Sequence, residues 1–220
     1  MSTTDKLYGL IFSEISLGVV IPILIGLLIL AFPTLIYDLL ETVKISFPEY
    51  IWGGTEVPLQ HILTIGTAEG IMTCAVPIML GITWNRWAGG ASGFLMTLLF
   101  VLSMGIYYGI PYGMIAFNPT LDWLAMIVSG MLAGYIAGSL MTRARMRGND
   151  NFKNMLFASF VAAAVATVIT TQAYIWYAPM FKMGVDYWSD VGLAWFTYIA
   201  IYGVWSLFAA IGAKISTWFT

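Results

Sequence analysis

The stretch LGVVIPILIGLLILA, residues Leu17–Ala31, decides the fold because none of its side chains is polar or charged. Two later stretches, Met126–Met141 and Asn154–Phe181, also contain no charged residue. About 20 apolar residues cross the hydrocarbon core of a bilayer as a helix, and a helix satisfies its backbone polar groups within its own segment. A transmembrane β-barrel would show short segments of alternating hydrophobicity instead. The sequence therefore predicts helices that span a membrane.

The composition extends this prediction to the whole chain. Of the 220 residues, 60% are hydrophobic and 9% are charged, and the mean hydropathy is +0.86. Soluble domains carry roughly 25% charged residues, so a soluble fold would lack the polar side chains to cover its surface. We expect an all-α polytopic bundle in the cell membrane, in which residues 1–220 form a single integral membrane domain.

Apolar length, interrupted by charged residues, glycine and proline, predicts about six transmembrane helices. We place them at Ser13–Tyr37, Leu59–Thr83, Gly89–Tyr108, Leu121–Met141, Asn154–Tyr177 and Val191–Ile215. The first of them is too long for a cleavable signal peptide and lacks a small-residue cleavage pattern.

The basic residues predict that the N-terminus and the C-terminus are both cytoplasmic. In that orientation the cytoplasmic segments hold Lys6, Arg86, Arg143, Arg145, Arg147, Lys153 and Lys214. The outer segments hold only Lys44 and Lys182, together with Asp38, Glu41, Glu49, Glu56, Asp122, Asp186 and Asp190. This asymmetry follows the positive-inside rule. We interpret the basic loop Arg143–Lys153 as an anchor beside anionic lipid and not as a nucleic-acid site.

The sequence offers little catalytic chemistry. Cys74 lies inside the second predicted helix, and we interpret it as a small buried hydrophobe. The single histidine, His61, cannot supply the paired ligands of a b-type haem, and we interpret it as a polar residue at the outer rim. No Cys or His cluster has the spacing of a zinc or copper site, and phosphate-loop, serine-elbow and zinc-protease motifs are absent. We therefore expect neither an enzyme nor a bound cofactor or metal.

Small residues recur at four-residue spacing on two predicted helices. They are Gly130, Gly134 and Gly138 on the fourth, and Ala158, Ala162 and Ala166 on the fifth. This spacing places each set on one helix face, where a second backbone can approach closely. Two interpretations remain open, namely packing within this bundle and docking of a partner membrane subunit.

Aromatic and polar residues gather toward the outer halves of the fifth and sixth predicted helices. The candidates for substrate binding are Gln172, Trp176, Tyr198, Tyr202 and Trp205. Trp and Tyr at a membrane surface usually form an interfacial belt, and that interpretation accounts for Trp176. Tyr202 and Trp205 lie deeper than such a belt requires. The alternative is an aromatic-walled pocket that opens to the outside, with Gln172 and hydroxyl groups as polar anchors.

Glu69 and Glu14 are two acidic residues within predicted helices whose roles can be weighed. A carboxylate buried in a bilayer costs several kcal/mol unless it is paired or hydrated, so Glu69 should face the interior of the bundle. There it would contact a ligand or ion, or act as a structural hydrogen-bonding partner. Glu14 lies near the inner interface, where lipid headgroups and water can solvate it, and we interpret it as structural.

Three stretches resemble the substrate-binding subunits of energy-coupling factor (ECF) vitamin transporters. Gly89–Leu95 (GGASGFL) is similar to the glycine-rich start of their third helix. Ser129–Gly138 (SGMLAGYIAG), followed by Arg143 and Arg145, resembles their Gly-Leu-Leu-Ala-Gly helix and its basic exit. Ala178–Met180 resembles the outer edge of their pocket.

The resemblance implies a subunit that binds a vitamin-like small metabolite from outside, under a cap formed by the loop Asp38–Pro58. It also implies docking on an energised membrane subunit that carries two ATPases, which would supply the energy for uptake. The Ala-x-x-x-Ala docking motif of the family's first helix is absent here, where Gly9 and Ser13 are the nearest substitutes.

A different class of function fits the same features. A non-catalytic accessory subunit of a larger respiratory or electron-transfer complex in the membrane would also show small-residue faces and isolated intramembrane acids. A binding subunit should gather its polar and aromatic groups at one site, whereas an accessory subunit should spread them over its contacts with partners. A small-solute channel would need a continuous polar line across several helices, and the sequence does not trace one.

Overall fold

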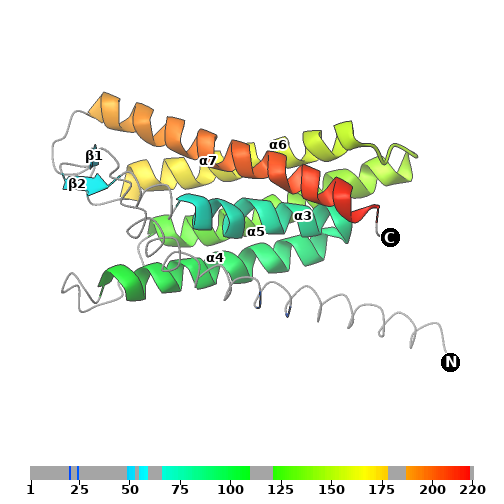
Figure 1. Ribbon diagram of the computed structural model, residues 1–220, viewed down its shortest axis with the longest axis horizontal. Helices are drawn as coiled ribbons and strands as arrows, with labels where there is room; N and C mark the ends of the chain where they lie inside the picture. The colour runs from blue at the N-terminus through cyan, green and yellow to red at the C-terminus, as the bar shows by residue number, and fades with distance from the viewer. Residues whose placement is uncertain are drawn as a thin grey trace, which may run out of the picture.

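A computed structural model describes residues 20, 24, 49–52, 55–58, 66–109, 121–177 and 187–218. Within these ranges the chain forms long helices that lie side by side and alternate in direction along the long axis of the molecule (Figure 1). They are the helical stretch Gly66–Thr83, α4 (Arg86–Gly109), α5 (Leu121–Met146), α6 (Phe152–Tyr177) and α7 (Tyr187–Ser216). The first stretch contains a π-helical turn, η1 (Ile71–Ala75), followed by α3 (Val76–Thr83).

The predicted helical bundle is confirmed for the described residues. Four helices are long and apolar enough to cross a membrane: Gly66–Thr83, Trp123–Met146, Phe152–Ala173 and Ala194–Ser216. They fall within or close to the second, fourth, fifth and sixth predicted spans. The third predicted span corresponds to α4, whose described apolar part, Arg86–Leu102, is shorter. The first predicted span lies outside the described residues except for Val20 and Leu24, which are helical.

A short β-hairpin departs from the all-α prediction. Its strands, β1 (Glu49–Trp52) and β2 (Thr55–Pro58), pair antiparallel with Trp52 opposite Thr55. In the sequence, Gly53 and Gly54 separate the two strands. The hairpin lies at the end of the molecule where α6 ends and α7 begins (Figure 1). It belongs to the loop that the sequence predicts after the first span.

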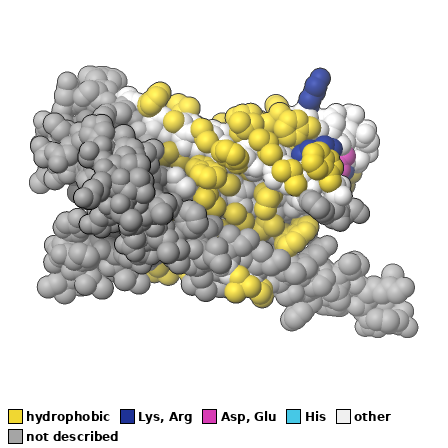
Figure 2. Space-filling view, in the orientation of Figure 1, with side chains coloured by type: hydrophobic (Ala, Val, Ile, Leu, Met, Phe, Trp, Pro, Cys, Tyr) yellow, Lys and Arg dark blue, Asp and Glu magenta, His cyan; other side chains and the backbone are white. Residues whose placement is uncertain are grey.

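The opposite end of the bundle carries the basic residues of the described ranges. They are Arg86, Arg143, Arg145, Arg147, Lys153 and Lys214 (Figures 1 and 2). Asparagine side chains begin two helices here, because Asn85 Oδ1 accepts the N–H groups of Trp87 and Ala88, and Asn151 Oδ1 accepts that of Asn154. The connected helices α5 and α6 run antiparallel, with their charged ends together (Figure 1).

Glycines bring α5 into backbone contact with α3 and α4. Gly134 lies against Gly89, where an added Cβ would stand 2.9 Å from the Gly89 Cα. A Cβ at Gly138 would lie 2.6 Å from the Arg86 backbone nitrogen, and one at Gly93 would meet the Gly130 carbonyl. Side chains cannot fit at such separations, so these glycines let the helices approach until their backbones touch.

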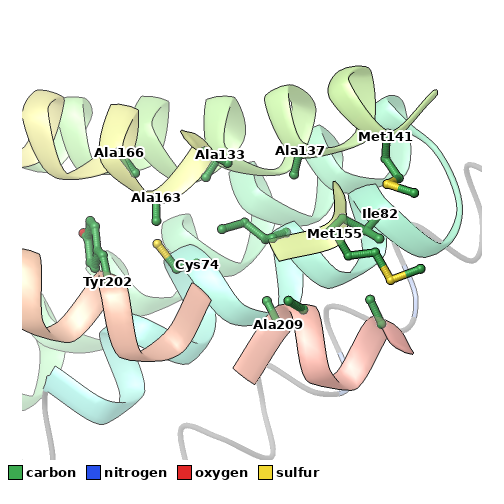
Figure 3. Packing of buried hydrophobic residues seen from close by; sticks show 14 of the residues in the cluster. Cys74, Ile82, Ala133, Ala137, Met141, Met155, Ala163, Ala166, Tyr202 and Ala209 are labelled. Atoms are coloured by element: carbon green, nitrogen blue, oxygen red, sulfur yellow. The ribbon is translucent and has the colours of Figure 1, made fainter. Parts of the chain in front are cut away.

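Alanines fill the core between α5 and α6. Ala158, Ala162 and Ala166 of α6 are all buried, and the core that they enter contains Ala133 and Ala137 of α5 (Figure 3). The face predicted for helix packing on α6 therefore lies inside this chain, as does the glycine face of α5. The described parts of both faces are occupied by neighbouring helices of the same bundle.

Candidate functional site

Glu69 lies in the most enclosed of the candidate membrane spans. In Gly66–Thr83, 72% of the residues are buried, against 33–39% in the other three spans. The stretch packs against α4, α5 and α7 and so stands at the centre of the described bundle. The Glu69 side chain is only 7% exposed. This placement agrees with the expectation that the carboxyl group faces the interior.

Tyr202 is the hydrogen-bonding partner of this carboxyl group. The Tyr202 hydroxyl donates to Glu69 Oε1 at 2.8 Å across a sequence separation of 133 residues. Tyr202 is completely buried, and its ring lies beside small core residues, among them Ala166 of α6 and Cys74 of η1 (Figure 3). The helix α7 thus places a polar group beside Glu69 in the interior of the bundle.

Hydroxyl groups continue the polar contact from α7 into α6 and α5. The Tyr202 hydroxyl lies 3.4 Å from Thr170 Oγ1. Thr170 donates to Ser129 Oγ at 2.8 Å, and Ser129 donates to the Met126 carbonyl oxygen at 2.7 Å. Thr170 and Ser129 are buried. We call Glu69, Tyr202, Thr170 and Ser129 the Glu69 cluster, and it joins side chains from four helical segments.

Aromatic rings adjoin the cluster on α7. Tyr198 is buried and meets the Tyr202 ring edge-on, with 5.6 Å between the ring centroids. The half-buried Trp205 lies over Gly70, where an added Cβ would stand 2.6 Å from the indole nitrogen. Gly70, the residue after Glu69 in the sequence, therefore leaves room for the Trp205 side chain. The structure brings together four of the predicted site residues: Glu69, Tyr198, Tyr202 and Trp205.

The other two predicted site residues lie elsewhere. Gln172 and Trp176 are exposed on the surface of α6, where the Trp176 indole N–H donates to Gln172 Oε1 at 3.0 Å. Trp176 is 71% exposed. Residues 172 and 176 are four apart and share one face of α6, whereas Ala166 and Thr170 occupy the buried face. The predicted convergence of Gln172 with Tyr202 is therefore not what the structure shows.

The sequence analysis missed Thr170 and Ser129 as members of the site. Thr170 follows Ala166 by four residues, so it lies on the face that small residues reserve for close packing. Ser129 stands one position before the first glycine of α5. Hydroxyl groups on or next to a small-residue face were the signal that could have identified them.

The π-helical turn was also missed, although Pro77 offered a signal. Proline has no backbone N–H, and its ring clashes with the carbonyl group four residues earlier, here that of Thr73. The chain widens before this position, and the Val76 N–H donates to the Ile71 carbonyl five residues back. Single π-helical turns within α-helices occur often at functional sites. This one begins two residues after Glu69.

Some buried hydroxyl groups have no hydrogen-bond partner among the described residues. They are Thr73, Thr97 and Thr171, together with the Ser139 hydroxyl. Thr73 lies four residues after Glu69 on the same helical stretch and is completely buried. Burying a hydroxyl group without a partner costs about 1–3 kcal/mol, so Thr73 is an unsatisfied polar group on the helical stretch that carries Glu69.

Neither a positive charge nor a metal-binding group of side chains stands beside Glu69 in the described ranges. The described lysines and arginines lie at the basic end of the bundle, and Glu69 stands about 20 Å along its helix from Thr83 at that end. No three His, Cys, Asp or Glu side chains in these ranges are grouped to hold a metal ion. Cys74 is buried in the core, while His61 and Glu14 lie outside the described residues.

Comparison of the chain with protein-family models, with curated proteins and with solved structures finds no match.

Proposed function

We propose that this protein is a multi-pass cell-membrane protein that binds a small solute at the Glu69 cluster and serves as the substrate-binding subunit of an uptake system. The observation that carries the proposal is the buried carboxyl group of Glu69, bonded to Tyr202 within a helix apolar enough to cross a membrane. Ionisable residues inside membrane helices are costly and typically mark paths or sites for substrates and ions.

The cluster has the composition of a binding site. A small-molecule site usually combines apolar and aromatic walls with a few convergent polar groups. Here the walls are Tyr198 and Trp205, and the polar groups come from Glu69, Tyr202 and Thr170. Convergence of these groups from separate helices supports a binding subunit over an accessory subunit.

Six spans with cytoplasmic termini are part of the proposal. The described basic residues share one end of the bundle, and the hairpin residues Glu49 and Glu56 belong to the other end (Figure 1). This distribution supports a cytoplasmic basic end under the positive-inside rule. Single cysteines placed at Trp52 and Lys182 should react with a membrane-impermeant reagent from outside, and one at Arg145 only after permeabilisation. Labelling of position 145 in intact cells would show that the protein has the opposite orientation.

Uptake of a vitamin-like metabolite energised by partner subunits rests on the ECF resemblance. The glycine faces that carry much of that resemblance are used inside the chain, where Gly134 packs on Gly89. A partner subunit would therefore dock on another surface. In the family that surface belongs to the first helix, which here lies almost entirely outside the described residues.

Purification from native membranes tests the proposal. The wild-type chain and Glu69→Gln should be isolated in mild detergent, and the co-purified small molecules and proteins identified by mass spectrometry. We expect a small metabolite with the wild type, its loss from Glu69→Gln, and membrane and ATPase subunits with both. Equal amounts of every small molecule in the two preparations would contradict substrate binding at Glu69.

The second candidate function is an accessory subunit of a larger membrane complex. The Gln172–Trp176 pair favours it, because an amide on an exposed helix face beside apolar residues such as Val168 can serve a partner helix. Co-purification with respiratory or electron-transfer subunits, without a bound metabolite, would establish this second function.

A further inference from the structure

With Glu69 ionised, the Glu69 cluster has fewer hydroxyl hydrogens to donate than it has oxygen–oxygen contacts. Each hydroxyl group has one hydrogen to donate. Tyr202 donates to Glu69, Thr170 donates to Ser129, and Ser129 donates to the Met126 carbonyl group. The 3.4 Å contact between Tyr202 Oη and Thr170 Oγ1 then has no hydrogen of its own. An ionised Glu69 would leave several acceptor lone pairs facing one another.

The negative charge of an ionised Glu69 would also lack a counter-charge. The charged residues on the described parts of the neighbouring helices stand near helix ends: Arg86, Asp122, Arg143, Arg145, Lys153, Asp190 and Lys214. The described titratable groups near Glu69 are Tyr202 on α7 and Cys74 on η1, and Tyr198 lies beside Tyr202. From α5 and α6 the described members of the cluster are the uncharged hydroxyl groups of Ser129 and Thr170. No described group supplies a positive charge.

A cation satisfies both deficits together. It would neutralise the carboxylate and accept the unused lone pairs of Glu69, Tyr202 and Thr170. The completely buried and unpartnered hydroxyl group of Thr73, four residues along the same helix, offers a further oxygen atom. Hard cations prefer oxygen ligands, and irregular turns in membrane helices supply them for Na⁺ and H⁺ in transporters. One carboxylate balances one positive charge, which favours a monovalent cation.

We propose that the Glu69 cluster binds a monovalent cation, either Na⁺ held by the oxygen atoms of Glu69, Tyr202 and Thr170 or a proton carried by the Glu69 carboxyl group. In the proton-bound form, Glu69 donates to Tyr202 Oη, and Tyr202 donates to Thr170. Tyr202, Thr170 and Ser129 then each accept one hydrogen bond and donate one, and all the bonds run in one direction from Glu69 to the Met126 carbonyl group. The inference rests on the proposed function, because it assigns a ligand class to the same site.

Thermal unfolding of the full-length protein in nanodiscs tests the cation. Na⁺ should replace choline at constant ionic strength, at several pH values, with K⁺ as a second arm. For a sodium site we expect a saturable rise in Tm of several degrees with Na⁺ in the wild type. For a proton site we expect a rise in Tm as the pH falls, without an effect of Na⁺. Both responses should be absent from Glu69→Gln.

Asp150→Asn is the matched control. Asp150 is an exposed acid at the basic end, where it accepts a hydrogen bond from Arg145 at 3.2 Å. Its substitution removes one carboxyl group and should leave the response of the wild type intact. Identical responses of the wild type, Glu69→Gln and Asp150→Asn to Na⁺ and to pH would overturn the proposal.

Two further measurements cover a Glu69→Gln variant that fails to fold. Equilibrium binding of radioactive Na⁺ to the wild type should be saturable, and infrared difference spectra should show whether a buried carboxyl group is protonated. If the wild type shows no saturable Na⁺ binding and also no protonated carboxyl group, the proposal is overturned. A cation response without a co-purified metabolite would instead overturn metabolite binding alone, so the two failures are distinguishable.

Discussion

Two regions of the same bundle are built differently. One is the contact of α5 with α3 and α4, which joins backbones, and the other is the Glu69 cluster, which joins side chains. At the first, Gly134 and Gly89 bring two backbones together without side chains. At the second, hydroxyl and carboxyl groups from separate helices meet through side chains, with Tyr202 at the centre. The first contact can only position helices, because it offers no group to a ligand. The second costs free energy to bury and offers groups that a ligand could use.

The two regions should also respond differently to mutation. A contact between backbones cannot yield, since neither helix can move without disturbing its other neighbours. A contact between side chains can rearrange, take up water or bind a ligand. Substitutions at the glycines should therefore affect stability most, and substitutions in the cluster should affect stability less and binding more.

The largest effect is expected for Gly134→Leu. The new side chain would meet the backbone of Gly89, so overpacking should destabilise the protein by about 3 kcal/mol or prevent folding. Gly203→Leu on α7 is the matched control, because an added Cβ there has no neighbour within 4 Å. Thermal unfolding of both variants in detergent measures the difference. Equal stabilities would show that the α4–α5 contact tolerates bulk.

The glycine contact was largely foreseeable from the sequence, because four-residue spacing of small residues directly encodes a smooth helix face. The spacing did not reveal which surface would cover that face, and the structure places α3 and α4 on it. The helix bounds were also foreseeable. The predicted Leu121–Met141 became Leu121–Met146 because the basic residues that end the apolar run can continue the helix into the interface.

The Glu69 cluster was foreseeable only in part. Helical spacing placed Tyr198, Tyr202 and Trp205 on one face of α7, and the cost of burial pointed Glu69 inward. The bond between Tyr202 and Glu69 joins residues 133 positions apart, and no local pattern encodes it. Gln172 was grouped with these residues because it is polar and near the outer end of α6. Gln172 lies two residues after Thr170 and therefore faces away from it on the helix, so it does not join the cluster.

The next effect in size is expected for Tyr202→Phe. Loss of the hydroxyl group removes the donor to Glu69 Oε1, so stability should fall by about 1–3 kcal/mol. Tyr135→Phe is the control, since Tyr135 packs edge-on against Trp87 and removal of its hydroxyl group should change stability by less than about 0.5 kcal/mol. Chemical or thermal unfolding compares them. If both variants match the wild type, the Tyr202–Glu69 bond contributes nothing to stability.

A smaller effect is expected for Gly70→Ala. The added methyl group would collide with the Trp205 indole, which is a half-buried side chain and can rotate away. We expect a loss of about 1 kcal/mol, at the low end for overpacking. In the double variant Gly70→Ala with Trp205→Phe the smaller ring should restore most of the loss, which a double-mutant cycle would report as coupling. Strictly additive effects would show that the two residues do not touch.

The smallest effect is expected for Gln172→Leu, which sharpens the boundary of the site. Gln172 is exposed on α6 and bonds only to Trp176 among the described residues, about 8 Å along the helix from its end at Tyr177. Replacing an exposed amide with an apolar side chain should change the stability of the isolated protein by less than about 0.5 kcal/mol. It should leave the cation response and the retention of a metabolite unchanged, because neither depends on that face of α6. Thermal unfolding with and without Na⁺, together with mass spectrometry of bound small molecules, measures both. If Gln172→Leu abolishes metabolite retention while Tyr202→Phe does not, the binding site lies on the outer surface of α6, and the Glu69 cluster is structural.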